Sequence, residues 1–310
     1  MKIGLIDVDG HNFPNLPLMK LSAYHKKQGD QTGFYSPWDG IVEPYDIVYM
    51  SKVFSFTPDY QAPVYATEVH RGGSGYCIDL EDGKEVYHAE RDKNLPSEIE
   101  HIYPDYELYG EERAIGFLTR GCPRGCGFCH VASKEGKCSY KVADLDEFWA
   151  GQKEICLCDP NLLASADHMD LLQQLVDTKA KVEFNQGVDI RMVTDKNLEL
   201  LRQIRLKTIH FAYDRYQDKK IVEPRLKDFK EATGYGRSKV LVYILCNYDT
   251  TLEQDLERIA YVRSLDFAPY VTVYDLAHAD PIYKKLHRWC NNYYIFWAEP
   301  DFYKYQKYKK

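Results

Sequence analysis

The sequence lacks a hydrophobic run long enough to cross a membrane, because no apolar stretch in its 310 residues approaches the roughly 20 that a spanning helix needs. The first apolar segment meets Asp7 too early for a secretory signal peptide. Nine cysteines in a chain without an export signal favour reduced thiols over a disulfide framework. We therefore expect a cytoplasmic protein with no membrane partner.

An excess of basic residues is also absent. The chain has 40 Lys and Arg against 47 Asp and Glu, which gives a net charge of −7. This balance does not indicate nucleic acid as a partner, since such surfaces need an excess of cations. With 45% hydrophobic and 28% charged residues, the composition is that of an ordinary globular protein with a real core.

The most informative stretch is a cysteine-rich loop, residues 119–130. Cys122, Cys126 and Cys129 have the spacing C-x3-C-x2-C and follow an apolar run, residues 114–118, that predicts a buried strand. Glycines in the loop allow the backbone to fold tightly. Thiolates are the usual ligands of iron–sulfur clusters, which normally take four. Three local cysteines therefore leave one iron of a cubane cluster open to a ligand that is not protein.

A structural zinc site is the alternative for these cysteines, with His130 or Cys138 as the fourth ligand. Zinc ligands usually come as a close pair followed by a distant second pair. The sequence has no such second pair, so the iron–sulfur interpretation is favoured. The isolated cysteines Cys77, Cys138, Cys246 and Cys290 are expected to be small buried hydrophobes.

The loop resembles the signature of the radical S-adenosylmethionine superfamily, in which an aromatic residue precedes the third cysteine. The resemblance implies that Cys122, Cys126 and Cys129 bind a [4Fe–4S] cluster and that Phe128 shields it. It also implies S-adenosylmethionine as a second cofactor, which chelates the open iron and is cleaved after reduction. The resulting 5′-deoxyadenosyl radical abstracts a hydrogen atom from a substrate. An electron donor such as flavodoxin or ferredoxin is then an expected partner, while the sequence identifies neither the substrate nor a catalytic residue that acts on it.

Strands that alternate with helical patterns predict an α/β fold. From residue 113 to 310, six strands are predicted, at 114–118, 154–157, 182–184, 208–212, 240–245 and 270–274, with amphipathic helices between them and a short closing element after them. Six βα units are too few for a closed eight-stranded barrel. They match the partial (β/α)6 barrel that the resemblance implies.

The N-terminal part, residues 1–80, is predicted to be an open parallel-sheet (Rossmann-like) domain. Its strands are expected at 2–8, 32–35, 47–50 and 64–67, and a helix begins near Pro17. This domain resembles the cobalamin-binding domain that precedes the barrel in one subgroup of the superfamily. The charged, proline-containing residues 81–112 are predicted to be a linker.

Cobalamin is therefore a further cofactor to consider. The loop of residues 9–14 partly resembles the D-x-H-x-x-G motif that ligates cobalt, with His11 in the ligand position and Pro14 in place of the glycine. A solvated loop histidine is the favoured interpretation. Members that are methylthiotransferases place three more cysteines in this domain, where only Cys77 occurs here, so that reaction is not favoured.

Candidate cofactor-binding residues follow the predicted strands, because ligands gather at the carboxyl ends of parallel strands. They are Asp159 and Asn161 after the second strand, Gln186, Asp189 and Arg191 after the third, Asp214 after the fourth and Asn247 after the fifth.

Two of these positions depart from the family. The second strand lacks the Gly-Gly-Glu-like motif that holds the methionine amino group, so Asp159 either accepts from that ammonium or caps a helix. The fifth-strand motif is degenerate at Asn247. After the third strand, Gln186 and Asp189 are expected to reach ribose hydroxyls and Arg191 a carboxylate, with a surface salt bridge between Asp189 and Arg191 as the alternative. These departures keep a second hypothesis open, a non-catalytic metal-binding or regulatory protein on the same fold.

Overall fold

The computed structural model describes residues 1–10, 13–81 and 84–305 and divides into two compact units, Met1–Cys156 and Leu157–Lys310. This division does not test the predicted domain boundaries at residues 80 and 112, which stay predictions. His11, the residue on which the cobalt-ligand resemblance depends, lies outside the described residues.

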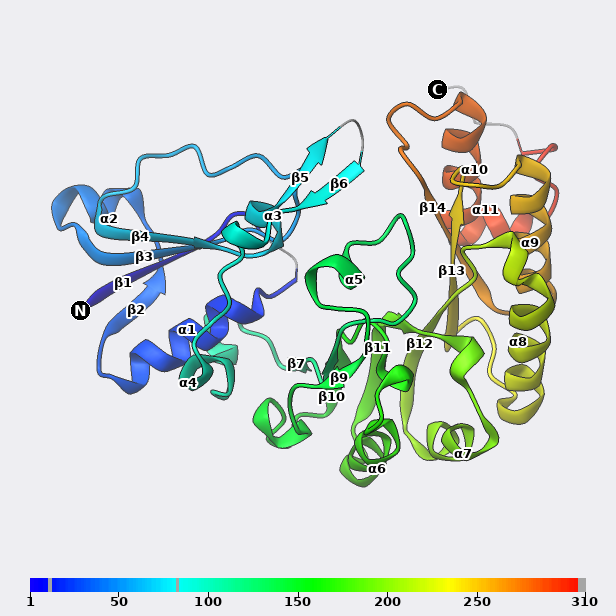
Figure 1. The fold of residues 1–310 in the computed structure, drawn as a ribbon, viewed down its shortest axis with the longest axis horizontal. Coiled ribbons are helices and arrows are strands. Elements are labelled where there is room, and N and C mark those ends of the chain that lie inside the picture. The colour runs from blue at the N-terminus through cyan, green and yellow to red at the C-terminus, as the bar shows by residue number, and fades with distance from the viewer. Residues whose placement is uncertain (11–12, 82–83, 306–310) are drawn as a thin grey trace. The chain divides into compact units, whose positions relative to one another are not determined.

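The first unit begins with a four-stranded parallel sheet. Its strands β1 (Lys2–Asp7), β2 (Gln31–Phe34), β3 (Tyr45–Ser51) and β4 (Ala66–Gly72) lie in the order β2-β1-β3-β4 (Figure 1). Helices α1 (Leu16–Lys27) and α2 (Pro37–Val42) connect the first three strands. The predicted open parallel-sheet domain is confirmed, although its fourth strand begins two residues later than predicted and extends to Gly72.

Helix α1 begins at a buried cap. The Asn15 side chain accepts a hydrogen bond from the Leu18 backbone N–H at 3.2 Å and donates one to the Ser51 hydroxyl at 2.9 Å. Asn15 therefore provides a hydrogen-bond acceptor for a backbone N–H at the start of α1 and connects the helix to the carboxyl end of β3.

The stretch predicted as a linker is folded. It contains most of the hairpin of β5 (Ile78–Glu81) and β6 (Lys84–Tyr87), then η1 (Ala89–Arg91), α4 (Ser97–Glu100) and η2 (Tyr106–Leu108). A short helix, α3 (Ser74–Cys77), precedes the hairpin. Ile99 of α4 packs with Ile3, Leu5, Leu18 and Leu21 in the core beneath the first sheet. These residues therefore help to hold the N-terminal sheet together.

The second sheet has six strands. They are β7 (Ala114–Gly116), β10 (Glu154–Leu157), β11 (Lys181–Val188), β12 (Leu206–Ala212), β13 (Val240–Cys246) and β14 (Ala268–Val273), in the order β14-β13-β12-β11-β10-β7. Neighbours in this sheet follow one another in the chain, and the pairs from β11 to β14 are parallel. This is the arrangement of a partial (β/α)6 barrel, as predicted.

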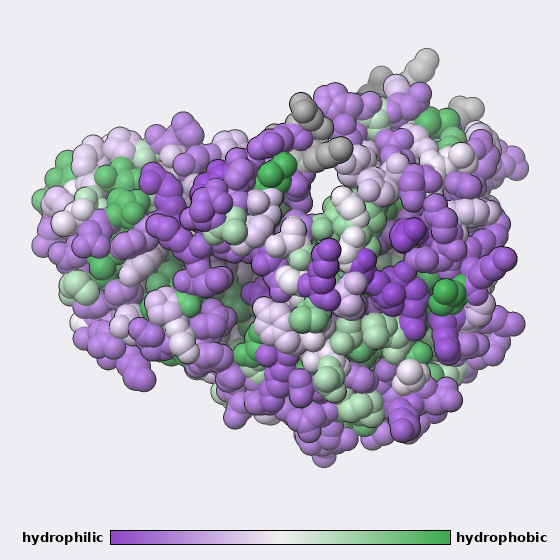
Figure 2. Space-filling view, in the orientation of Figure 1, coloured by the Kyte–Doolittle hydropathy of each residue, from purple (hydrophilic) through white to green (hydrophobic). Residues whose placement is uncertain are grey.

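Helices follow the strands of this sheet. They are α6 (His168–Thr178), α7 (Asp195–Gln203), α8 (Lys219–Thr233), α9 (Leu252–Ser264), α10 (Pro281–Asn291) and α11 (Tyr293–Ala298), with the turns η4 (Leu162–Ala164), η5 (Ile190–Met192) and η6 (Tyr216–Asp218) between them (Figure 1). Hydrophilic residues cover most of the face that Figure 2 shows, with small hydrophobic groups between them. Among the residues whose placement is described, none of the helices has the length and apolarity to cross a membrane.

Helix α9 begins at a capping box formed by Thr251 and Gln254. Its most buried residues include the charged pair Asp255 and Arg258, on the same helix face as Ile259 and Val262.

Candidate functional site

The cysteine loop is closed at its base by a two-stranded ribbon. Strands β8 (Thr119–Arg120) and β9 (Tyr140–Lys141) pair antiparallel, and the Cys122 N–H donates to the Gly136 carbonyl at 3.2 Å. A one-turn helix, α5 (Val131–Lys134), follows the third cysteine. The three cysteines therefore lie on a single excursion of the chain.

Two backbone features make this loop tight. Gly121 has φ +78°, and a Cβ at this position would lie 2.0 Å from the Cys138 carbonyl oxygen, so only glycine fits. The Cys129 N–H donates to the Cys126 carbonyl at 3.0 Å, which turns the chain between the second and third cysteines. The glycine requirement inferred from the sequence therefore has a physical basis at Gly121.

Ion pairs hold the two sides of the loop. Glu135 accepts hydrogen bonds from the Gly121 N–H and the Arg120 guanidinium, each at 3.0 Å. The guanidinium of Arg120 also lies 3.4 Å from the centre of the Phe117 ring. These contacts position the loop before any ligand is present.

The thiols differ in exposure. Cys122 and Cys126 are half-buried and Cys129 is exposed. Three thiols on a glycine-constrained loop are the donor set that an iron–sulfur cluster with one open iron takes, so the residues present fit a [4Fe–4S] cluster.

The two residues considered as a fourth zinc ligand are placed differently. His130 Nδ1 lies 2.7 Å from a Glu85 carboxylate oxygen, and Cys138 is exposed, which corrects the expectation that it is buried. Cys77, Cys246 and Cys290 are buried as expected.

The candidates after the second strand are deeply placed. Asp159 is 4% exposed and Asn161 is 2% exposed, so both belong to the interior at the carboxyl end of β10. Burial of a polar side chain without a hydrogen-bond partner is costly, so both positions belong to a polar interior.

The third strand is longer than predicted. Gln186, expected in a loop, is an exposed residue of β11, whose pairing with β12 is irregular between Phe184 and Val188. Gly187 has φ +119° in this irregular part. A bulge of this kind turns successive side chains out of the regular alternation of a strand.

Asp189 and Arg191 form the ion pair that was considered as the alternative to a cofactor role. Arg191 Nε donates to Asp189 at 2.7 Å, and its Nη1 donates to Asp218. The Asp189 side chain is only 6% exposed, so this pair is shielded from water and is not the surface bridge that was expected. The structure thus connects the end of β11 with η6, beyond the end of β12.

Asp214 belongs to the same group of charges. Burial raises the pKa of Asp214 to about 6, while the Leu245 N–H, Arg258 and Arg191 act in the opposite direction and Asp189 adds to the rise. The backbone N–H of Leu245 donates to its carboxylate at 3.1 Å. Asp189, Arg191 and Asp214 are therefore within electrostatic reach of one another.

Asn247 is engaged elsewhere. Its side-chain amide donates to the Tyr274 carbonyl at 3.1 Å, and its backbone has φ +63°. This contact connects the ends of β13 and β14, so the structure gives Asn247 a positioning role.

The sequence did not single out Arg258 and Asp255, although both are completely buried. The Arg258 guanidinium donates to the carbonyls of Tyr213, Asp214 and Leu245 and to the Asp255 carboxylate. Asp255 and Arg258 are three residues apart and lie on the same helix face as Ile259 and Val262. This spacing is the sequence feature from which their burial could have been predicted.

His210 and Tyr243 were also missed. His210 Nδ1 lies 2.7 Å from the Asn185 carbonyl and 3.1 Å from the Tyr243 hydroxyl, and burial lowers the pKa of His210. His210 alternates along β12 with the buried Ile209 and Phe211, so it points to the opposite face of the sheet. A histidine between two apolar residues of a predicted strand is the sequence feature from which His210 could have been identified.

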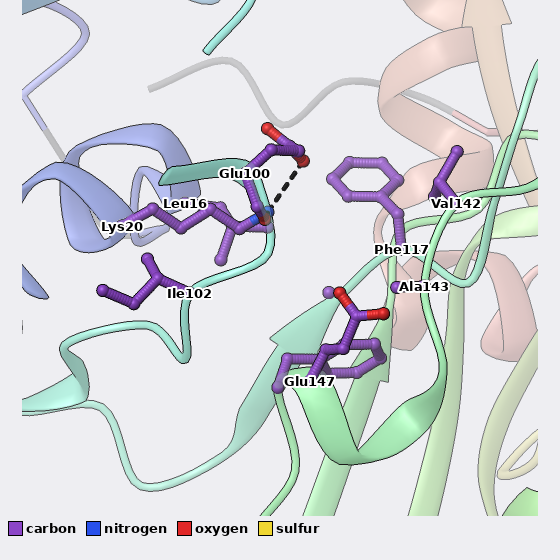
Figure 3. Close-up of a pocket in the computed structure, with 10 residues that line it drawn as sticks. Leu16, Lys20, Glu100, Ile102, Phe117, Val142, Ala143 and Glu147 are labelled. Carbon is purple, nitrogen blue, oxygen red and sulfur yellow. Dashed lines mark hydrogen bonds and ion pairs between the residues drawn. The ribbon is translucent and has the colours of Figure 1, made fainter. Parts of the chain in front are cut away.

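A pocket of the first unit lies beside β7 (Figure 3). It is lined by Leu16, Lys20, Glu100, Ile102, Gly116, Phe117, Val142, Ala143, Glu147 and Phe148, which include none of the predicted site residues. Lys20 Nζ pairs with Glu100 Oε1 at 2.7 Å within it. The pocket is a packing feature between α1, α4 and β7.

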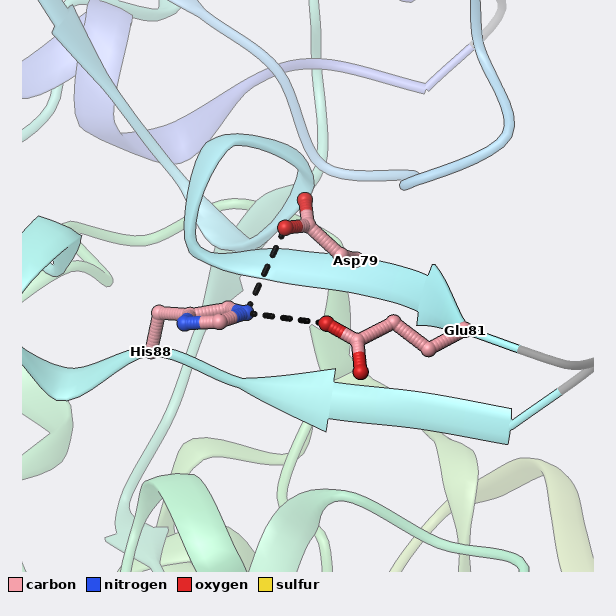
Figure 4. Close-up of side chains that lie close together, drawn as sticks. All are labelled: Asp79, Glu81 and His88. Atoms are coloured by element: carbon pink, nitrogen blue, oxygen red, sulfur yellow. Dashed lines mark ion pairs between the residues drawn. The ribbon is translucent and has the colours of Figure 1, made fainter.

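Asp79, Glu81 and His88 lie close together on the hairpin (Figure 4). His88 Nε2 is 3.3 Å from Asp79 and 3.8 Å from Glu81. Arg91 donates to both oxygens of Asp79 and holds the pKa of that carboxyl below its ordinary value. The group is therefore an exposed ion-pair network in which the Asp79 carboxylate is already paired with the Arg91 guanidinium.

The three-cysteine loop lies on a partial (β/α)6 barrel, which is the combination that the resemblance to the radical S-adenosylmethionine superfamily implies. Among curated proteins the chain is similar to the ribosomal protein uS12 methylthiotransferase RimO from two strains of Leptospira biflexa, with 31% identity over 114 residues. The match covers 32% of this chain and 24% of each relative, so the chain spans about a quarter of the length of these relatives.

Two solved structures show weaker similarity. SuiB of Streptococcus suis bound to S-adenosylmethionine has a TM-score of 0.44 at 14% identity, over 60% of this chain and 48% of that chain. SuiB bound to the precursor peptide SuiA has a TM-score of 0.40 at 13% identity, over 62% and 48%. No family model matches the chain. These structural similarities are too low to carry a functional argument.

Proposed function

We propose that the protein is a radical S-adenosylmethionine enzyme. Cys122, Cys126 and Cys129 hold a [4Fe–4S] cluster whose open iron binds the amino and carboxylate groups of S-adenosylmethionine. Reduced by one electron, a cluster held there would supply the electron that cleaves the S–C5′ bond of S-adenosylmethionine, giving methionine and a 5′-deoxyadenosyl group that would take a hydrogen atom from the substrate.

The observation that supports this proposal is the set of three cysteines on one short loop, in which position 121 admits only glycine and two of the thiols are half-buried. Three thiolates leave the fourth ligand position of a cluster to a group that is not protein. Phe128 is assigned the shielding role, because it directly precedes the third cysteine.

Asp159, Asn161, Gln186, Asp189, Arg191, Asp214 and Asn247 are proposed to bind or position S-adenosylmethionine. Asp189 and Asp214 offer carboxylates for hydroxyl or ammonium groups. Arg191 acts through its ion pair with Asp189, which fixes the carboxylate, and Asn247 acts by holding the ends of β13 and β14 together.

The proposed environment is the cytoplasm, with flavodoxin or ferredoxin as the electron donor, because an oxygen-sensitive cluster needs a reducing compartment. Methylthio transfer is not the proposed reaction. The only cysteine before the loop is Cys77, which is completely buried, so this region offers no second set of three thiols.

The test is an anaerobic reconstitution with iron and sulfide, followed by reduction in the presence of S-adenosylmethionine. We expect four irons per chain and the formation of 5′-deoxyadenosine and methionine, with the number four taken from the cluster type. Cys122→Ala, Cys126→Ala and Cys129→Ala should each abolish product formation. Cys138→Ala is the matched control, because Cys138 is an exposed cysteine of the same loop, and it should retain both cluster and products.

The second candidate function is a non-catalytic metal-binding or regulatory protein. The engagement of Asn247 with Tyr274 and of Arg191 with Asp189 favours it, because side chains proposed for the cofactor are bound to the protein. Zinc in place of iron, or an intact cluster that forms no 5′-deoxyadenosine, would support this function and rule out the first.

A further inference from the structure

A pocket of about 380 Å³ opens at the carboxyl edge of the N-terminal sheet, within the size range of small-molecule sites. The apolar side that it presents to solvent includes Pro17, Leu95 and Pro96, and its polar side includes the ends of β3 and β4 together with Arg120 and Lys134. Ligands of open parallel sheets bind at this edge.

The charges of this pocket are unbalanced. Its cations are Arg71, Lys93, Arg120 and Lys134, and its acids are Asp92 and Glu100, so the lining carries four positive and two negative charges. The chain as a whole carries −7. The charge of this pocket is therefore opposite in sign to the net charge of the chain, which indicates a function specific to the pocket.

Three of the four cations have no carboxylate within ion-pair distance. Within the described part of the chain Arg71 and Lys93 form no ion pair, although Arg71 interacts electrostatically with Asp59, and Lys134 donates to the neutral Ser74 hydroxyl at 2.6 Å. Only Arg120 is paired, with Glu135.

The two acids, in contrast, are occupied. Glu100 pairs with Lys20 at 2.7 Å, and Asp92 accepts from the Tyr87 hydroxyl at 3.0 Å. The pocket therefore presents cations to a ligand while its carboxylates face other partners.

The shape of the ligand follows from the other walls. Pro17, Leu95 and Pro96 are the apolar lining residues that keep some exposure, and Tyr49 stacks on His70 at 5.3 Å between ring centres beside them. A free inorganic anion would make no contact with these apolar walls. A dianionic group with several oxygens can contact several cations at once, which favours phosphate over a single carboxylate.

We propose that this pocket binds an organic phosphate, with the phosphate on Arg71, Lys93 and Lys134 and an aromatic or apolar part against Pro17, Leu95 and Pro96. This inference is independent of the cluster and of S-adenosylmethionine. It gives the first unit a ligand-binding function of its own.

The test uses 1-naphthyl phosphate as the probe, measured by calorimetry on the full chain at low ionic strength, where exposed charges are least screened. Inorganic phosphate and 1-naphthol serve as probes that carry only one of the two parts. We expect 1-naphthyl phosphate to bind at least tenfold more tightly than either. Equal affinity for 1-naphthol, or no saturable binding of 1-naphthyl phosphate at millimolar concentration, would overturn the proposal.

The variant Arg71→Met/Lys93→Met should weaken 1-naphthyl phosphate binding at least tenfold. Both residues are exposed, so the fold should survive. Lys196→Met/Lys227→Met makes the same change in net charge at two exposed lysines of α7 and α8 and should change the affinity less than twofold. An equal loss in both variants would mean that only the net charge matters and would refute the site.

The two proposals fail separately. Arg71→Met/Lys93→Met should keep the cluster and the cleavage of S-adenosylmethionine, whereas Cys126→Ala should lose cleavage and keep 1-naphthyl phosphate binding. If Cys126→Ala also lost the organic phosphate, the pocket would depend on the cluster and the claim of independence would be wrong.

Discussion

Arg258 is the residue whose replacement should harm the second unit most. It is fully buried, as is its partner Asp255, and it donates to the carbonyls of Tyr213, Asp214 and Leu245. One guanidinium therefore joins the carboxyl ends of β12 and β13 to α9. Arg258→Met keeps the length of the side chain but leaves a buried carboxylate without its cation.

The expected cost is about 3–5 kcal/mol of unfolding free energy, the usual result of removing one partner of a buried ion pair. Some of this comes from the three carbonyls, since each unsatisfied buried acceptor costs about 1–3 kcal/mol before relaxation or water entry. At roughly 2–4 °C per kcal/mol for a unit of this size, the melting temperature should fall by roughly 6–20 °C. Urea unfolding followed by circular dichroism measures the free energy, and calorimetry measures the melting temperature.

Two further variants separate the mechanism from a general loss of charge. Arg225→Met removes a 47% exposed arginine of α8 that lies 3.9 Å from Asp228, and it should cost less than about 0.5 kcal/mol. Arg258→Met/Asp255→Leu removes both buried charges and should be more stable than Arg258→Met alone. If Arg258→Met costs under about 1 kcal/mol, or if the double variant is the less stable one, the stranded carboxylate is not the cause and the reasoning fails.

Three other predictions follow from single residues. Gly121→Ala should lower the iron content after reconstitution and the stability by about 1–3 kcal/mol, because φ is +78° and a Cβ meets the Cys138 carbonyl; Gly125→Ala, with φ +57° and open space, should cost less. Asp214 has a pKa raised by burial from 3.8 to about 6, so between these values the folded chain binds more protons than the unfolded chain and stability falls as the pH rises. Asp214→Asn should therefore gain up to about 3 kcal/mol relative to the wild type between pH 4 and pH 7 in urea titrations, and a constant difference across that range would contradict the raised pKa. Thr251→Ala should cost about 1 kcal/mol because Thr251 caps α9, whereas Thr250→Ala should be near neutral; the reverse order would contradict the cap at Thr251.

The cysteine loop was predictable because its information is local. The spacing of Cys122, Cys126 and Cys129 and the glycines between them occupy a few consecutive residues, and the strand before them is a short apolar run. The six strands of the second sheet were predictable for a similar reason, since each is an apolar segment bounded by polar residues. None of these inferences needed a contact between distant parts of the sequence.

The third strand was harder, because its end does not look like a strand. Asn185 and Gln186 are polar and precede a glycine, a pattern typical of a loop, yet they continue β11. Pairing with β12 holds the segment extended up to Val188, with an irregular register after Phe184. Tertiary pairing here overrides local preference.

Buried charges were the least predictable feature. Arginine and aspartate on a helix are usually solvated, so Asp255 and Arg258 were not recognised as core residues of α9. Their burial depends on three carbonyls supplied by two strand ends far away in the sequence. Arg191 is similar, because its second carboxylate, Asp218, comes from another element.

The charges of the two units favour ligands of opposite sign. Around Arg191 lie three carboxylates, Asp189, Asp214 and Asp218, while Arg258 is balanced by Asp255, so these strand ends carry an excess of two negative charges. The pocket of the first unit carries an excess of two positive charges. S-adenosylmethionine has a sulfonium, an ammonium and one carboxylate, so its net charge is positive and the carboxylates at the strand ends would attract it. The proposed organic phosphate has the opposite charge, so the cations of the N-terminal pocket would attract it. If both proposals hold, electrostatics would favour the cofactor at the strand ends of the barrel and the anion in the N-terminal pocket.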